Sequence, residues 1–126
     1  MPRGSSLKKT GFDVVRRMGL ALPDIEEGKV YASPALKVHG QMFACLAVNR
    51  SAEPNTLVVR MAFDQRDDLI AEKPETYYLA EHHVNYPCVL VRLDRVNHDE
   101  LRDLLLMGCQ FVSTTKKREV RKRKRR

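Results

Sequence analysis

Residues 35–48 read Ala-Leu-Lys-Val-His-Gly-Gln-Met-Phe-Ala-Cys-Leu-Ala-Val, and this stretch decides the fold class of the 126-residue chain. It places two apolar runs, residues 35–38 and 42–48, on either side of His39-Gly40. Two residues that end in glycine between apolar runs are typical of a tight β-hairpin, because glycine accepts a positive φ. The chain is therefore expected to build antiparallel strands joined by turns rather than parallel strands joined by helices.

Toward the N-terminus from this hairpin, residues 9–22 have the spacing of an amphipathic helix. Val14, Val15 and Met18 fall on one face of it. Pro23 ends the helix, because the residue before a proline is pushed out of the α region. We therefore expect one helix ahead of the sheet.

Toward the C-terminus, short apolar runs alternate with helical patterns. Asn97 followed by Glu100 resembles a capping box at the start of a last helix. Leu101, Leu104 and Leu105 lie on one stripe of that helix, which predicts packing on the sheet or sharing with a partner. We expect strands at residues 29–32, 56–61, 76–79 and 88–93, and helices at residues 64–71 and 97–112.

The order is one helix, three or four strands, a helix, two strands and a last helix. It predicts an α+β fold, written α-β(3)-α-β(2)-α when only three strands precede the second helix. We expect a two-layer sandwich in which three helices flank an antiparallel sheet of about five strands. One domain spans residues 9–113. Residues 1–8 are expected to form a flexible N-terminus, and residues 114–126 a disordered polybasic tail, because so charged a segment cannot bury a core.

The net charge of +7 is concentrated in the tail. Residues 116–126 hold nine of the 23 Lys and Arg residues and one of the 16 acids, a net charge of +8. The other 115 residues hold 14 bases and 15 acids, a net charge of −1. Attraction to a polyanion is therefore expected to come mainly from the tail.

Catalytic and metal-binding patterns are absent from the sequence. No Gly-rich phosphate loop or nucleophile elbow occurs. Cys45, Cys88 and Cys109 lie in apolar stretches without C-x-x-C spacing, so we expect buried, reduced and inert thiols. His82 and His83 are adjacent, but no second Cys/His pair has zinc spacing. We predict that the protein is not an enzyme and has no cofactor and no metal site.

No part of the sequence favours a membrane. Apolar runs stay far below the length of about 18 residues that a transmembrane helix needs. The N-terminus lacks the apolar core of a secretory signal. We expect a cytoplasmic protein with no membrane partner.

Four stretches follow the pattern of a known family. Residues 21–27 read Ala-Leu-Pro-Asp-Ile-Glu-Glu, and residues 33–44 read Ser-Pro-Ala-Leu-Lys-Val-His-Gly-Gln-Met-Phe-Ala. Residues 86–93 read Tyr-Pro-Cys-Val-Leu-Val-Arg-Leu, and residues 101–112 match a closing helix. Over residues 12–112 the chain resembles the bacterial YjbR/MmcQ family.

The resemblance implies a two-layer α+β sandwich similar to secretion-chaperone folds. It also implies a DNA-binding role, which has been proposed for the family by analogy with a double-wing motif. Gln41 stands where the family has lysine, and Cys88 stands where relatives often have tryptophan. The chain has no tryptophan, and its basic tail is not part of the family pattern.

Two functions of different classes follow. The first is non-enzymatic nucleic-acid binding, with non-specific electrostatic affinity from the tail and a contribution from the sheet surface. The second is a protein–protein interaction module, homodimeric or chaperone-like, that shares the last helix and an edge strand with its partner. The predicted nucleic-acid contacts are Lys37, Arg60 and Arg92 on the sheet and Lys116, Lys117, Arg118, Arg121, Lys122, Arg123, Lys124, Arg125 and Arg126 in the tail.

Overall fold

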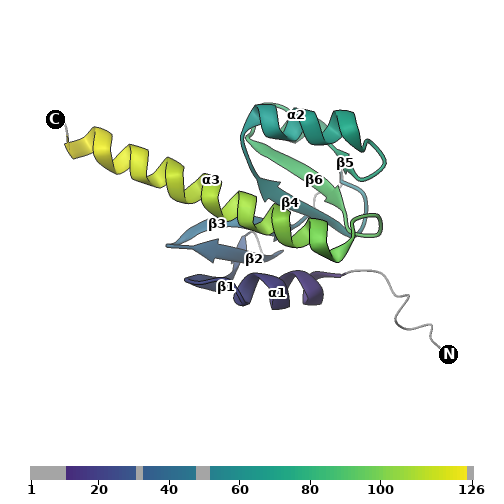
Figure 1. The fold of residues 1–126 in the computed structure, drawn as a ribbon, viewed down its shortest axis with the longest axis horizontal. Helices are drawn as coiled ribbons and strands as arrows, with labels where there is room; N and C mark the ends of the chain where they lie inside the picture. Colours follow the sequence, from purple (N-terminus) through teal and green to yellow (C-terminus); the bar gives the residue numbers. More distant parts are fainter. Residues whose placement is uncertain (1–10, 31–32, 48–51, 125–126) are drawn as a thin grey trace.

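The computed structural model describes residues 11–30, 33–47 and 52–124, with side chains described up to residue 114. The predicted flexible segment, residues 1–8, lies outside these ranges. Within them, no helix combines the length and the apolar character that crossing a bilayer requires. The elements, shown in Figure 1, are α1 (Phe12–Leu20), β1 (Ile25–Val30), β2 (Ser33–Val38), β3 (Gln41–Leu46), β4 (Thr56–Arg60), α2 (Phe63–Glu72), β5 (Tyr77–Tyr78), the 3-10 helix η2 (Glu81–His83), β6 (Cys88–Arg92) and α3 (His98–Lys124).

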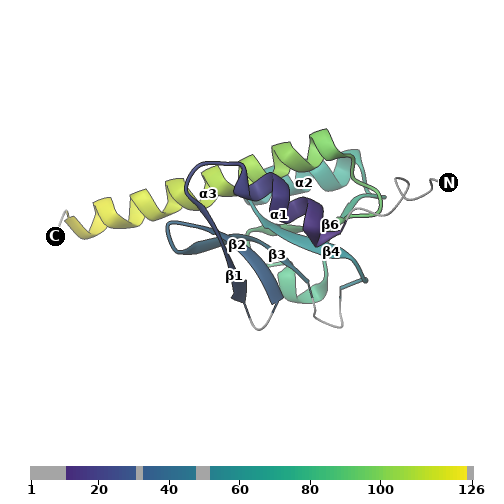
Figure 2. The same cartoon turned by 90° about the horizontal axis from the view of Figure 1, so that it is seen from below.

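The strands form one antiparallel sheet with the order β1-β2-β3-β4-β6-β5. Figure 2 shows the α-helices together on one face of this sheet. The predicted two-layer α+β sandwich is therefore confirmed.

The sheet has six strands rather than the predicted five, because β1 forms a full edge strand. The prediction began a strand only at Lys29, since Glu26, Glu27 and Gly28 lack strand-like composition. In the structure, β1 pairs with β2 along its whole length, from Ile25 opposite Val38 to Val30 opposite Ser33. Backbone pairing with a neighbouring strand thus overrides the weak local preference.

The predicted hairpin joins β2 and β3 and is confirmed. His39 and Gly40 both have positive φ, 52° and 80°. Two positive φ values are the signature of the mirror-image turns that match strand twist. A bulge between Leu36 and Lys37 shifts the register of the pair. This local irregularity increases the twist of the sheet beneath α3.

α3 packs on the sheet through the predicted stripe. Leu101, Leu104 and Leu105 are buried in one core with side chains from β2, β3 and β4. A Cβ at Gly108 would lie 3.0–3.2 Å from a side-chain methyl of β4 and from backbone oxygens of β3 and β4. Glycine therefore lets α3 approach the strands closely at this point.

The predicted end of the last helix, Val112, is wrong. α3 continues to Lys124, so the backbone of most of the predicted disordered tail is helical. Residues 113–124 contain no glycine or proline, and lysine and arginine are good helix formers. Figure 1 shows this end of α3 projecting beyond the sheet. The core helix and the basic segment are thus one continuous element.

Candidate functional site

The three basic residues predicted on the sheet do not form one surface. Arg60 ends β4 and pairs with Cys88, whereas Arg92 ends β6 and pairs with Thr56 at the other end of these strands. Four steps of about 3.4 Å along β4 put roughly 13 Å between those ends. Lys37 lies on β2, separated from β4 by β3, and its aliphatic stem lies against β1. The three side chains therefore offer no common basic patch.

Arg92 is neutralised within the fold. Its Nε and Nη2 donate to the two carboxylate oxygens of Glu53, each at 2.8 Å, and Nη1 donates to the carbonyl oxygens of Pro74 and Glu75. The guanidinium also lies 4.2 Å from the centre of the Tyr78 ring. Hydrogen bonding from Arg92 lowers the pKa of Glu53 below its usual range. Arg92 therefore joins three segments of the fold. Because its charge is already paired, it is poorly suited to the nucleic-acid contact that the sequence predicted for it.

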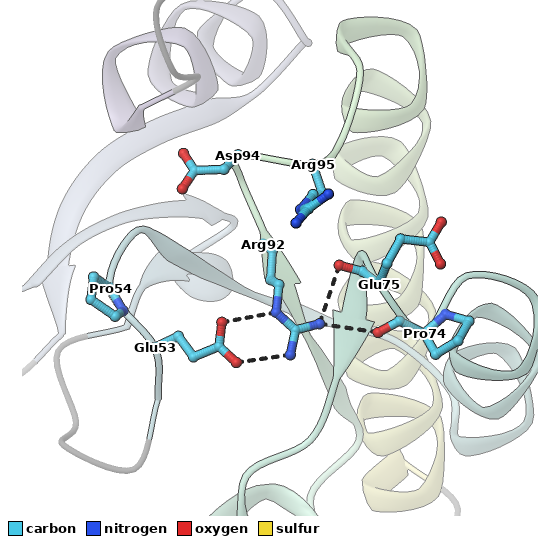
Figure 3. A pocket seen from close by; sticks show the side chains of 7 residues that line it. All are labelled: Glu53, Pro54, Pro74, Glu75, Arg92, Asp94 and Arg95. Carbon is cyan, nitrogen blue, oxygen red and sulfur yellow. Dashed lines mark hydrogen bonds and ion pairs between the residues drawn. The ribbon is translucent and has the colours of Figure 1, made fainter.

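A hollow of about 410 Å³ lies beside this ion pair (Figure 3). Three of its lining residues are acids and two are arginines, so its walls are net negative once Arg92 is paired. Such walls do not favour a phosphate. The lining residues are Glu53, Pro54, Pro74, Glu75, Arg92, Asp94 and Arg95.

Arg66 is a buried cation that sequence reasoning missed. It lies on α2, and its Nη1 and Nη2 donate to the carbonyl oxygens of His83, Val84 and Tyr86 at 2.8–3.2 Å. Its guanidinium also lies 4.7 Å from the centre of the Phe63 ring. Only 6% of Arg66 is exposed. It therefore fixes the loop that follows η2, and no local pattern distinguishes it from a surface arginine.

Arg60 is held differently, since its partners are two aromatic rings. Its guanidinium carbon lies 4.9 Å from the centre of the Tyr86 ring and 5.4 Å from that of Phe111. Its Nε is buried and has no acceptor among the side chains and backbone that the structure describes. No ion pair joins it to a described acid, in contrast to Arg92. The two rings hold the guanidinium in place, and within the described part of the chain no carboxylate compensates its positive charge.

Three exposed apolar side chains lie on the segments that Arg66 joins, and one of them, Tyr86, is the ring against Arg60. Phe63 is 44% exposed, Val84 47% and Tyr86 39%. Arg66 connects them, because it lies over Phe63 and binds the carbonyls of the other two residues. We call Arg60, Phe63, Val84, Tyr86 and Phe111 the Arg60 shelf. Aromatic rings combined with arginine are the composition of binding hot spots.

The basic end of α3 begins next to this shelf. Lys116 follows Phe111 by five residues, which is about 7.5 Å along a helix axis. Of the predicted tail contacts, Lys116–Lys124 have a helical backbone, while their side chains and residues 125–126 lie outside the described part. α3 therefore connects Arg60 to the densest positive charge in the chain.

The thiols offer no reactive centre. Cys45 and Cys88 are buried and free, as predicted, and Cys109 is partly buried rather than fully so. Burial raises the pKa of Cys45 to about 11 and that of Cys88 to about 12. Such thiols stay protonated near neutral pH and are weak nucleophiles. Among the residues that could be searched, no three His, Cys, Asp or Glu side chains are grouped as metal ligands.

Comparisons with known proteins identify the family but no activity. A solved structure of the Deinococcus radiodurans protein DR2400, with family-model domain DUF419, has a TM-score of 0.63 and 21% identity. The likeness covers 77% of this chain and 74% of that chain, and at this identity it shows the fold alone. No curated protein matches. The YjbR family model matches residues 20–107, which contain every strand of the sheet, α2 and the first ten residues of α3, so the chain belongs to the YjbR family.

Proposed function

We propose that this protein binds nucleic acid without catalysing a reaction on it, through the basic end of α3 and Arg60. One observation carries the proposal: the helix that packs in the core continues without interruption into the basic segment. The core thereby holds the segment in a defined direction next to Arg60, which has no ion pair with an acid among the described residues.

The charge distribution supports this assignment. Residues 116–126 have a net charge of +8 and the rest of the chain −1. A polyanion is attracted by residues 116–126 and not by the rest of the chain. In the proposed complex the basic end of α3 therefore faces the nucleic acid. Release of counterions from the phosphates supplies the free energy of such binding. Little sequence preference is expected, because phosphate contacts carry no direct information about bases.

Phosphates also stabilise the helical form of the segment. Lys117 with Arg121, and Arg118 with Lys122, are like-charged pairs at positions i and i+4. Such pairs destabilise an isolated helix by about 0.2–0.5 kcal/mol each. Neutralisation by phosphates removes that repulsion. We therefore expect the helix content of residues 113–124 to rise when nucleic acid binds.

The experiment is a salt titration of binding to unrelated DNA duplexes. The full chain is compared with a variant in which the nine bases of residues 116–126 are replaced by glutamine, which is also a good helix former. Engagement of six to nine phosphates gives a log–log salt slope of roughly −5 to −8 for the full chain, at about 0.9 per contact. The variant should lose nearly all binding. Equal binding by the two proteins, or no binding by either at low salt, contradicts the proposal.

The interaction-module alternative loses its main support. It was based on an apolar last helix and an edge strand available to a partner, but Leu101, Leu104 and Leu105 of that helix pack on the protein's own sheet. Leu106 is the one large apolar side chain of α3 that is strongly exposed within the described part. Such isolated exposure is ordinary for a soluble surface.

A further inference from the structure

We infer that the preferred ligand is single-stranded nucleic acid, with its bases stacked on Phe63 and Tyr86 and a backbone phosphate bound by Arg60. The inference rests on the proposed function and specifies its substrate class. It follows from the Arg60 shelf. Electrostatic binding to the basic end of α3 would not require the exposed rings of this shelf.

Each of the two rings lies against an arginine and is partly exposed. Arg66 lies 4.7 Å from the centre of the Phe63 ring, and Arg60 lies 4.9 Å from that of Tyr86, so an arginine supports each ring. The loop that carries Tyr86 is held by the three carbonyl contacts of Arg66. Even so, about two fifths of each residue remains exposed. Exposed rings on an immobile support are suited to stacking of flat ligands, because little conformational entropy is lost on binding.

Arg60, which lies against the Tyr86 ring, favours an anion beside the stacked group. The guanidinium is kept in place by Tyr86 and Phe111, and no described acid pairs with it. A planar guanidinium binds phosphate through parallel hydrogen bonds when its edge is accessible. A ligand that joins flat rings to phosphates therefore satisfies both parts of the shelf.

Base accessibility decides between single strands and duplexes. In a duplex the faces of the bases are covered by their neighbours, and only an unstacked strand can offer them to protein rings. The basic end of α3 starts about 7.5 Å along the helix beyond Phe111, so the same strand can continue along it. A duplex can place phosphates against the basic end of α3 and Arg60, but it cannot offer base faces to Phe63 and Tyr86.

The first test compares one labelled 20-nucleotide strand with its duplex, using the full chain. The double substitution Phe63→Leu and Tyr86→Leu removes the rings but keeps apolar side chains. Affinity for the single strand should fall at least about fivefold, since stacking on each of the two rings contributes between about fivefold and a hundredfold. Affinity for the duplex should change less than about twofold. Leu20→Ala, at a 44% exposed leucine of α1, is the matched control and should change neither affinity.

The second test does not depend on how the double variant folds. The chain has no tryptophan, so Phe63→Trp introduces a single fluorescent reporter into the shelf. Stacking of a base should quench its emission with the single strand and not with the duplex. Leu20→Trp, with the reporter on α1, should respond to neither.

The outcomes separate the inference from the proposed function. If the unmodified protein binds neither form of DNA, the proposed function fails. If it binds both and the ring substitutions weaken both equally, or neither, the single-strand inference fails while the proposed function stands. Emission that changes with protein concentration but not with DNA would identify the shelf as a contact between protein molecules and would overturn the inference.

Discussion

The guanidinium carbon of Arg60 lies 5.4 Å from the centre of the Phe111 ring, so the end of β4 contacts the helix that becomes the basic segment. This contact relates the sheet to the charged end of the chain. Arg92, on the neighbouring strand, shows the opposite arrangement, because Glu53 and two carbonyl oxygens bind its guanidinium. The two arginines therefore predict different consequences of substitution.

Replacing Arg60 should weaken nucleic-acid binding without unfolding the protein. In Arg60→Gln one unpaired cation is lost, so the magnitude of the log–log salt slope should decrease by about 1. Arg92→Gln is the control, and its slope should match that of the unmodified protein because Arg92 is already paired with Glu53. Salt titrations of both variants on one oligonucleotide measure the difference. An equal decrease in the slope for both variants would mean that the ion pair of Arg92 with Glu53 does not make Arg92 less available to nucleic acid than Arg60.

The ion pair of Glu53 and Arg92 should contribute stability that depends on pH. The pKa of Glu53 is lowered in the fold by hydrogen bonding from Arg92, so the contribution is present above the ordinary glutamate pKa of about 4.3. It is lost as the pH falls through the lowered value. Urea unfolding should therefore show Glu53→Gln less stable than the unmodified protein at neutral pH and nearly equal to it in strong acid. The effect should be small, since Glu53 is half exposed. A gap that widened in acid would contradict the assignment.

Arg66→Met should destabilise the protein and loosen the loop after η2. Three backbone carbonyls lose a charged donor, and one hydrogen bond to a charged group contributes about 1.5–3 kcal/mol. We therefore expect a loss of at least about 2 kcal/mol in the free energy of unfolding. Amide exchange should speed up around Val84 more than in β4. Arg102→Met, at an exposed arginine of α3, is the control and should cost less than about 0.5 kcal/mol.

Leu104→Ala should cost about 2–5 kcal/mol, because it leaves a cavity between α3 and the sheet. Leu104 is 2% exposed, and Leu106 lies two positions further on the same helix but is 38% exposed. Leu106→Ala should therefore cost less than about 1 kcal/mol. Chemical denaturation of the two variants provides the comparison. Similar losses at both positions would place the buried stripe of α3 elsewhere.

The cysteines should label in an order set by burial. Cys45 and Cys88 are buried, with pKa values raised to about 11 and about 12. Cys109 is only partly buried, and burial raises its pKa as well. A bulky thiol reagent near pH 8 should modify Cys109 first and the other two only after unfolding. Rapid native labelling of Cys88 would show that β6 opens more readily than its buried position implies.

Local patterns in the sequence were sufficient for the fold class and the charge distribution. The His39-Gly40 turn could be predicted because glycine accepts a positive φ whatever surrounds it. Leu101, Leu104 and Leu105 could be assigned to the core because helical spacing places them on one face. The concentration of positive charge in residues 116–126 is a matter of composition and needs no structure.

Tertiary structure decided which arginine is available and where the elements end. Arg60 and Arg92 both follow apolar strand residues, and only long-range contacts distinguish them: Glu53 lies 39 positions before Arg92, and Phe111 lies on another element from Arg60. β1 became a strand because β2 offered a complete row of backbone partners, despite its polar side chains. Hydrogen bonds and ring contacts between distant segments depend on which segments pack together in the folded chain. Residue type and local spacing do not specify that packing.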